Sequence, residues 1–263
     1  MNITIVCFCY KGDENILEYS LKAANTVFGN KIKIALVDDS LKPISKDILS
    51  KLKNELSCEF VYEKSTFNRN INLNGKDCIH GIVDSFIKHS KNRDGIVIKL
   101  DPDTMIMRRT VFDEFAKNDK FDYASCYRPG CQFCGMCYMI KTSILEKCKK
   151  CLYKFDLPED KGPEDYIIGL AACICSIPKM SQLMTIWRSG LTVHTEGVAW
   201  DYANDITDKA MKLYYDTAEF ATFGNWFLYK GLTSDDRIKP MEKMLDFLTN
   251  QNRSNFTYSV RTF

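Results

Sequence analysis

The chain has 263 residues, which is long enough to bury a sizeable core in one large domain. Its 36 Lys and Arg residues nearly balance 34 Asp and Glu residues, and this balance argues against a protein whose main task is to bind nucleic acid. Apolar residues make up 45% of the chain and charged residues 27%, which excludes extensive disorder.

No part of the sequence contains the roughly eighteen consecutive apolar residues that a transmembrane helix needs. Residues 1–10 lack the positively charged start of a signal peptide and are typical of a strand instead. We therefore expect a cytoplasmic protein, with contact at a membrane surface left open. In that compartment its 12 cysteines should be thiols or metal ligands rather than disulfides.

The first hundred residues alternate between short β-branched apolar runs and stretches with the apolar spacing of a helix. We expect strands over residues 3–9, 32–37, 60–62 and 95–100, and helices over residues 15–27, 45–56 and 76–89. Ser45 is the expected N-cap of the second helix. This order predicts an α/β fold in which helices cover both faces of a mostly parallel sheet and ligands bind at the carboxyl ends of its strands.

The second half of the chain alternates less regularly. We expect strands over residues 123–127, 136–140 and 183–188, and helices over residues 143–151, 164–174, 206–220 and 240–250. The expected organisation is one domain over residues 1–200 and a helical C-terminal extension over residues 201–263 that packs on it.

Asp101 and Asp103 follow directly after the apolar run of residues 95–100, separated only by Pro102. In an extended backbone, residues two apart point to the same side and lie less than about 7 Å from each other. Two carboxylates so placed suit a hard divalent cation that also takes oxygens from a diphosphate. Asp and Pro are also common in turns, and the buried strand before them is what favours a metal site.

Further polar residues occur where predicted elements begin or end. Asp38 and Asp39 end the second strand, where a carboxylate can accept hydrogen bonds from a base or ribose, although polar strand ends are common without a function. Glu164 and Asp165 begin a helix, where the helix dipole favours acids in any case. His194 follows a strand-like segment, and a single histidine is more often structural than a metal ligand.

Taken in order, these segments resemble the GT-A-fold glycosyltransferases of the family-2 type, which use a nucleotide-sugar and carry a DxD motif. The resemblance runs from residue 3 to about residue 194, and the C-terminal extension has no counterpart in it. It rests on residues 3–14, on LVDDS at 36–40, on IKLDPDT at 98–104, on CGMCYMI at 134–140, on residues 163–169 and on His194.

The resemblance implies a metal-dependent hexosyltransferase that moves a sugar from a nucleotide-sugar, in the first instance a UDP-sugar, to a glycan or a lipid-linked acceptor. Asp101 and Asp103, with His194, would hold Mn²⁺ or Mg²⁺ against the diphosphate. The Gln-x-x-Arg-Trp pattern of processive synthases is absent from the sequence, which indicates a single transfer.

By this resemblance the donor would contact Asp38 or Asp39, with Tyr10 and Asp101 in the same site. Lys76 belongs to a polar loop before a helix, and such a loop suits contacts with a sugar or a phosphate, although most of its residues are expected to be solvated. An inverting transfer also needs a carboxylate that takes the proton of the acceptor hydroxyl.

Asp165 is the expected base, and Glu164 is the second candidate. We expect the helix dipole to lower the pKa of Asp165 and keep it ionised.

Two alternatives remain open from the residues alone. The first is a nucleotidyltransferase with the same carboxylate–metal site. The second is a non-enzymatic interaction module stabilised by zinc, because the spacing of several cysteines resembles paired zinc knuckles. The cysteines concerned are Cys126, Cys131, Cys134, Cys137, Cys148 and Cys151.

Overall fold

The computed structural model describes residues 2–9, 12–40, 42–65, 75–126, 135, 137–154, 164–176, 184–186, 219–223 and 235–250. The strands are β1 (Asn2–Cys9), β2 (Ile32–Asp38), β3 (Glu59–Lys64), β4 (Gly95–Leu100), β5 (Thr104–Ile106), β6 (Tyr123–Cys126), β7 (Cys137–Lys141), β8 (Met184–Ile186) and β9 (Phe220–Thr222). The α-helices are α1 (Glu14–Phe28), α2 (Lys46–Glu55), α3 (Lys76–Ser90), α4 (Thr110–Lys117), α5 (Leu145–Lys154), α6 (Glu164–Cys175) and α10 (Ile238–Asn250).

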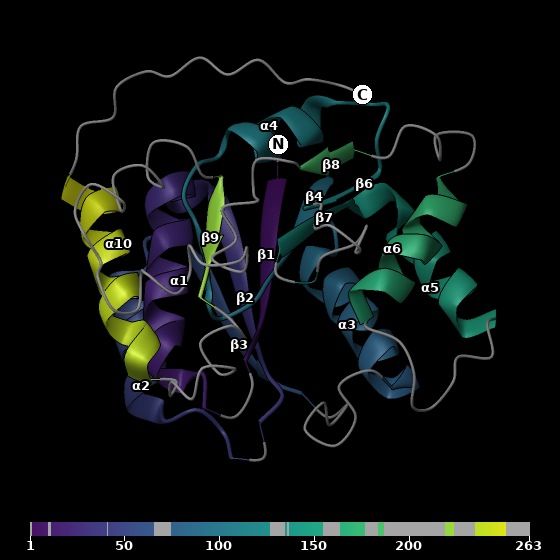
Figure 1. Cartoon of the computed structure of the whole chain (residues 1–263). Coiled ribbons are helices and arrows are strands. Elements are labelled where there is room, and N and C mark those ends of the chain that lie inside the picture. Colours follow the sequence, from purple (N-terminus) through teal and green to yellow (C-terminus); the bar gives the residue numbers. More distant parts are fainter. Residues whose placement is uncertain are drawn as a thin grey trace.

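Among the described residues, seven strands form one sheet in the order β3-β2-β1-β4-β7-β6-β8. Neighbouring strands are parallel except at β7, which runs antiparallel to both β4 and β6. Helices α1 and α10 lie on one side of the sheet and α3, α5 and α6 on the other (Figure 1). The expected α/β class, with a mostly parallel sheet covered on both faces, is confirmed.

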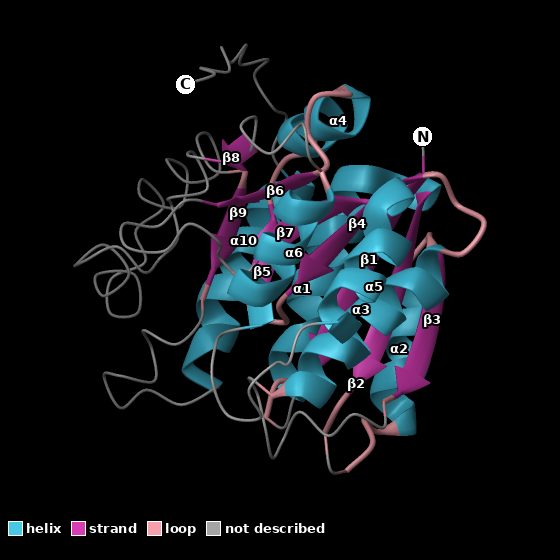
Figure 2. Ribbon diagram, turned by 90° about the vertical axis from the view of Figure 1, so that its right-hand side faces the viewer, coloured by secondary structure: helices cyan, strands magenta, loops and turns pink. Residues whose placement is uncertain are grey.

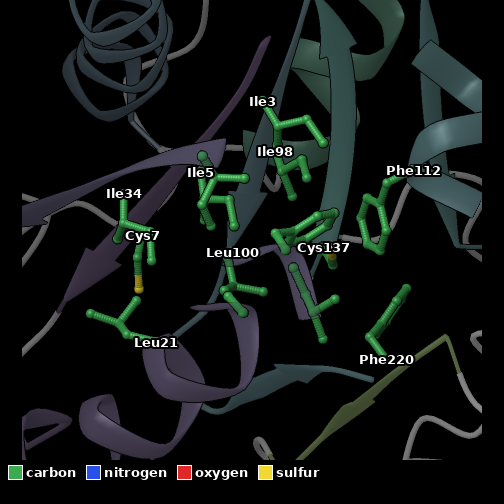
Figure 3. Close-up of a cluster of buried hydrophobic side chains, with 14 of the residues drawn as sticks. Ile3, Ile5, Cys7, Leu21, Ile34, Ile98, Leu100, Phe112, Cys137 and Phe220 are labelled. Carbon is green, nitrogen blue, oxygen red and sulfur yellow. The ribbon is translucent and has the colours of Figure 1, made fainter. Parts of the chain in front are cut away.

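Alternation of side chains along the central strands builds a core on each face of the sheet. On β1, Ile5 and Cys7 point to the face covered by α1, whereas Val6 and Phe8 point to the face covered by α3. Figure 3 shows the first of these clusters, in which Leu21 of α1 and Phe112 of α4 meet the strands. Since both faces are buried, the strands read as nearly continuous apolar runs in the sequence.

Local signals place the early helices as expected. The Ser45 side chain accepts a hydrogen bond from the backbone N–H of Ile48 at 3.3 Å, so Ser45 is the N-cap of α2. On α1, Ile16, Leu17, Leu21 and Ala24 are fully buried because they recur at helical spacing.

The C-terminal part of the chain joins the fold through a second, two-stranded sheet. Strand β9 pairs antiparallel with β5, directly after Asp103, and the residue before β9, Glu219, accepts hydrogen bonds from the N–H groups of Met107 and Arg108. The helix expected over residues 206–220 is therefore wrong at its end, because Phe220 begins a strand; residues 206–218 lie outside the described part. Phe220 is fully buried in the core, and a strand that pairs with β5 there provides hydrogen-bond partners for buried backbone groups.

Helix α10 lies beside α1, as both Figure 1 and Figure 2 show. Met241 and Met244 of α10 pack with Ile16 of α1 and with Met105 of β5 in a third buried cluster. Described segments beyond residue 200 thus pack on α1 and β5, and the division of the chain at residue 200 stays a prediction because that boundary lies outside the described residues. No helix among the described residues is both long and apolar enough to cross a membrane.

Candidate active site

The parallel strands β1, β2 and β4 end at one edge of the sheet, and the antiparallel strand β7 begins there. Acidic residues collect at this edge. Asp38 is the last residue of β2 and Asp39 follows it, while Asp101 and Asp103 follow β4. Because β7 runs antiparallel to β4, Gly135, which lies shortly before β7, is at the same edge of the sheet. The sheet topology therefore brings these four sequence-predicted carboxylates to one edge of the sheet.

The Asp101–Asp103 pair lies in a turn and not in an extended strand. The N–H of Thr104 donates to the carbonyl oxygen of Asp101 at 3.0 Å and closes the turn. The expectation of an extended backbone at this pair is therefore corrected, and the shared metal site stays a prediction. Asp101 pairs with Lys99, whereas Asp103 Oδ2 lies 3.1 Å from Arg237 Nη1.

Segments from distant parts of the chain hold the backbone of this turn. The Ser20 hydroxyl, buried on α1, donates to the carbonyl oxygen of Thr104 at 2.6 Å. From the C-terminal side, the N–H of Phe223 donates to the carbonyl oxygen of Asp103 at 2.7 Å. Because these bonds come from both sides, the position of the aspartate pair depends on α1 and on the chain after β9.

Lys99, for which the sequence predicts no role, lies at the centre of the site. Its side chain is fully buried, on the sheet face that α3, α5 and α6 cover. The Lys99 ammonium contacts the Asp101 carboxylate and the carbonyl oxygen of Gly135, and it lies 3.8 Å from Glu164 Oε1. A buried ammonium needs such partners, because an unpaired charge in the interior is strongly unfavourable. Lys99 thus links the end of β4 to Gly135, two residues before β7, and to the start of α6.

Glu164 and Asp165 begin α6 beside this ammonium. Asp165 is 9% exposed, and its Oδ1 accepts a hydrogen bond from the N–H of Tyr166 at 2.8 Å. Burial, followed by the charge of Glu164, raises the pKa of Asp165 from 3.8 to about 6, even though Lys99 acts in the opposite direction. The expectation that the helix dipole lowers this pKa is therefore wrong, since desolvation outweighs the N-terminal position.

Gly135 leaves the space in which the Asp165 carboxylate sits. A Cβ atom added to Gly135 would lie 3.0 Å from Asp165 Oδ2 and 3.3 Å from Asp165 Cγ. Real side chains seldom approach so closely, so a larger residue here would push the carboxylate away. The glycine in the sequence thus allows α6 to approach the chain just before the start of β7.

The two acids after β2 differ in their surroundings. Both oxygens of the buried Asp38 carboxylate are used within the protein: Oδ1 accepts hydrogen bonds from the Ser40 backbone and hydroxyl, and Oδ2 accepts from the Ile44 N–H and the Tyr62 hydroxyl. Burial opposes ionisation, but these bonds outweigh it and lower the pKa of Asp38. Asp39, also buried, accepts a hydrogen bond from the Ser65 hydroxyl at 3.2 Å. Asp38 therefore holds its own loop together.

The remaining sequence-predicted site residues are Lys76, Tyr10 and His194. Lys76 is the exposed first residue of α3, and α3 leads from β3 into β4, so its start lies at the same edge of the sheet. Tyr10 and His194 lie outside the described residues. Their assigned roles remain predictions.

Two carboxylates at this edge are accessible to a divalent cation. The Asp101 and Asp103 side chains are 24% and 17% exposed, so a ligand can reach both carboxylates. Mg²⁺ and Mn²⁺ accept such oxygens and are commonly held by one or two carboxylates together with substrate phosphates. No group of three His, Cys, Asp or Glu side chains suited to a metal occurs among the described residues, so other ligands would come from the donor, from water or from His194.

The structure contradicts one form of the zinc alternative, a single site that includes both Cys137 and Cys148. Cys137 points into the core on the α1 face of the sheet, whereas Cys148 is buried in the core on the α3 face. The sheet separates the two thiols, so they cannot share one ion. Most described cysteines are buried as small core residues, as Cys7 and Cys78 are. The Cys126 side chain, Cys131 and Cys134 lie outside the described part.

Sequence reasoning missed Lys99, Arg237 and Ser20. Lys99 had a signal, because it is a single charged residue inside the apolar run of residues 95–100. Ser20 is a polar residue on the apolar stripe of a helix, which is a weaker signal of the same kind. Arg237 had none, because only the tertiary structure brings it to Asp103 from 134 residues away.

No protein-family model matches the sequence, and no curated protein matches it either. Several solved structures have a similar fold. The glycosyltransferase GlyE of Streptococcus pneumoniae TIGR4 superposes with a TM-score of 0.53 at 11% identity, over 92% of this chain and 62% of GlyE. The chain thus spans less than two thirds of GlyE.

Galactosyltransferase LgtC, solved with donor and acceptor sugar analogues, gives a TM-score of 0.53 at 10% identity, over 91% of this chain and 95% of LgtC. The bifunctional glycosyltransferase WbbM gives 0.51 at 11% identity, over 91% of this chain and 49% of WbbM. These likenesses, together with the order of the sheet, show that the chain has the GT-A fold.

Proposed function

We propose that the protein is a metal-dependent glycosyltransferase that moves one sugar per reaction from a nucleotide-sugar, in the first instance a UDP-sugar, to a glycan or lipid-linked acceptor. One observation carries the proposal: at the carboxyl edge of a GT-A sheet, the partly exposed Asp101 and Asp103 lie in one turn, and Lys99 links Asp101 to the start of α6, where the buried Asp165 has a raised pKa. The fold alone supports glycosyl transfer only by analogy, because one fold serves many functions.

Asp101 and Asp103 are the residues that would hold the metal ion, together with His194. When bound, the cation would supply Lewis acidity that stabilises the charge developing on the departing nucleoside diphosphate. For the nucleoside we favour Asp39 over Asp38, because four hydrogen bonds within the protein already use both oxygens of Asp38. Tyr10 and Lys76 remain assigned to donor binding.

Asp165 would act as the base that removes the proton of the acceptor hydroxyl in an inverting transfer, with Glu164 as the second candidate. A base works best when its pKa lies close to the working pH, and the pKa of Asp165 is about 6. At neutral pH it is therefore mostly ionised, and it is a stronger base than an ordinary aspartate. Lys99 keeps this carboxylate near Asp101 by binding the elements that carry both.

Isothermal titration calorimetry on metal-free protein tests the proposal. UDP should bind in the presence of Mn²⁺ and only weakly after chelation, and Asp103→Asn should abolish the Mn²⁺-dependent part. Asp113→Asn, which removes an aspartate paired with Arg109 on the surface of α4, is the matched control and should bind as the wild type does. GDP, ADP and CMP tested alongside identify the nucleotide class. Undiminished Mn²⁺-dependent binding by Asp103→Asn would refute the assigned site.

A further inference from the structure

The C-terminal segment brings a cation to the proposed metal-binding turn. Arg237 ends a short 3₁₀-helix (Asp235–Arg237) just before α10. Its Nη1 lies 3.1 Å from Asp103 Oδ2, and its Nη2 lies 3.8 Å from Asp13 Oδ1, just before α1. The Arg237 side chain is only 5% exposed, whereas Asp103 and Asp13 are 17% and 19% exposed. A buried guanidinium thus bridges two acids that solvent can still reach.

Each aspartate of the pair has its own cation, and the two cations differ. Lys99 is fully buried and is held by a carboxylate, a carbonyl oxygen and a neighbouring glutamate, all on or beside the main sheet. Arg237 comes from outside the sheet, and its guanidinium pairs with two carboxylates that are both partly exposed. An incoming ion can therefore exchange with Arg237 more readily than with Lys99.

Asp103 cannot serve Arg237 and a divalent cation equally well. A dication on the Asp103 carboxylate places two positive charges a few ångströms from the guanidinium, and their repulsion is strong in a partly desolvated site. The displaced guanidinium then needs another anion. Its planar fork of donors binds phosphate oxygens as well as it binds a carboxylate.

We propose that Arg237 is a donor-binding residue that rests on Asp103 in the free protein and moves to the diphosphate of the donor when Asp103 takes the metal ion. The inference rests on the proposed function, since it needs a nucleoside diphosphate and a divalent cation at this turn. It gives the C-terminal extension, which has no counterpart in the resemblance, a direct part in donor binding.

The rest of the C-terminal segment is fastened independently, so the exchange needs only the Arg237 side chain to move. The Asn15 side chain donates to Asp235 Oδ1 at 3.0 Å, which ties the segment to the start of α1. Met241 and Met244 anchor α10 in the buried cluster against α1. The guanidinium therefore stays within reach of the same site after it leaves Asp103.

The proposal predicts effects of opposite sign in one variant. Arg237→Gln removes the cation that competes for Asp103, so Mn²⁺ alone should bind several-fold more tightly. The same variant loses a charge-assisted bond to the diphosphate, so UDP at saturating Mn²⁺ should bind about tenfold or more weakly. A purely structural role would weaken both.

The measurements are Mn²⁺ binding to chelator-treated protein by electron paramagnetic resonance, and UDP binding at saturating Mn²⁺ by calorimetry. Arg109→Gln is the matched control, because Arg109 forms a similar pair with Asp113 on α4, toward the edge of the sheet where β1 begins (Figure 1). It should change neither affinity. Circular dichroism confirms that each variant is folded.

Wild-type protein that fails to bind UDP with Mn²⁺ would refute the proposed function and this inference together. Normal wild-type binding combined with weaker binding of both ligands by Arg237→Gln, or with no change in either, would overturn this inference alone. If Arg237→Gln does not fold, Arg237→Lys decides: it keeps the charge but not the fork, so Mn²⁺ affinity should stay near wild type while UDP affinity falls. Unchanged UDP affinity in that variant would overturn the inference.

Discussion

Asp165 combines a stability cost with the role of general base that we propose for it. Burial raises its pKa from 3.8 to about 6, so the folded protein holds this proton more tightly than the unfolded chain does. The ionised carboxylate therefore destabilises the fold at pH values above about 6, and this penalty disappears as the pH falls below the ordinary aspartate value of about 4. A group that costs stability at neutral pH is a candidate for function.

Asp165→Asn should separate stability from activity. At neutral pH we expect its free energy of unfolding to rise by on the order of 2 kcal/mol, because the amide carries no charge to bury. Turnover should fall by roughly 10²–10⁴ because the base is lost. In the wild type, kcat should rise with pH through about 6 as Asp165 ionises. Urea unfolding at several pH values and steady-state kinetics measure these quantities.

Asp47→Asn is the control for that experiment. Asp47 is an exposed acid in the first turn of α2, so it shares only the helix-start position with Asp165. It should lose a little stability and keep full turnover. If Asp165→Asn behaves in the same way as Asp47→Asn, Asp165 is only a helix-start residue and Glu164 becomes the base to test.

At the scale of elements, the candidate site forms where the end of one strand lies beside the beginnings of another strand and a helix. The strand β4 ends in the Asp101 turn, β7 begins after Gly135, and α6 begins with Glu164 and Asp165. Lys99 contacts all three elements, and the Gly135 position sets how close α6 can come. Small changes in the distance between α6 and Gly135 should therefore move Asp165, the proposed base, and leave donor binding unchanged.

Gly135→Ala tests this approach. The added Cβ would lie 3.0 Å from Asp165 Oδ2, so the carboxylate must shift by a few tenths of an ångström. We expect kcat to fall by about tenfold because the base is misplaced, while the affinity for UDP with Mn²⁺ stays near that of the wild type. In an Asp165→Asn background the same substitution should have no further effect on kcat. An additive loss there would mean that Gly135 acts through some other group.

At the scale of the whole molecule, the C-terminal segments complete the site from outside the main sheet. Strand β9 pairs with β5, and the N–H of Phe223 donates to the carbonyl oxygen of Asp103. Arg237 pairs with the Asp103 carboxylate. Met241 and Met244 of α10 share one buried cluster with Ile16 of α1, Met105 of β5 and Phe223. Folding stability and donor binding should therefore change together when that packing is weakened.

Met244→Ala tests this dependence. Met244 is buried between α10 and α1, so the cavity should cost about 2–5 kcal/mol in the free energy of unfolding. UDP affinity with Mn²⁺ should fall as well, since Arg237 is less well held. Met244→Leu conserves volume and should cost less than about 1.5 kcal/mol, with donor affinity unchanged. Separate unfolding of α10 in urea with donor binding intact would contradict this role of the extension.

The sequence by itself determined most of the elements and their class. Apolar runs such as residues 95–100 predicted β4, and helical spacing predicted α1 and α3, because both faces of the sheet are buried and each strand and helix carries its own pattern. The order of these elements predicted the parallel sheet. It also placed Asp38 and Asp101 at one edge, because parallel strands end together.

Tertiary structure alone decided what those acids contact and how they ionise. Nothing local brings Arg237 to Asp103 or Ser20 to Thr104, since these contacts join residues 134 and 84 positions apart. The pKa of Asp165 was predicted in the wrong direction because its helix-start position is local, whereas its burial depends on Gly135 and the packing of α6. Sequence periodicity records which face of an element is buried, but the charge on a buried group depends on every neighbour that the fold brings to it.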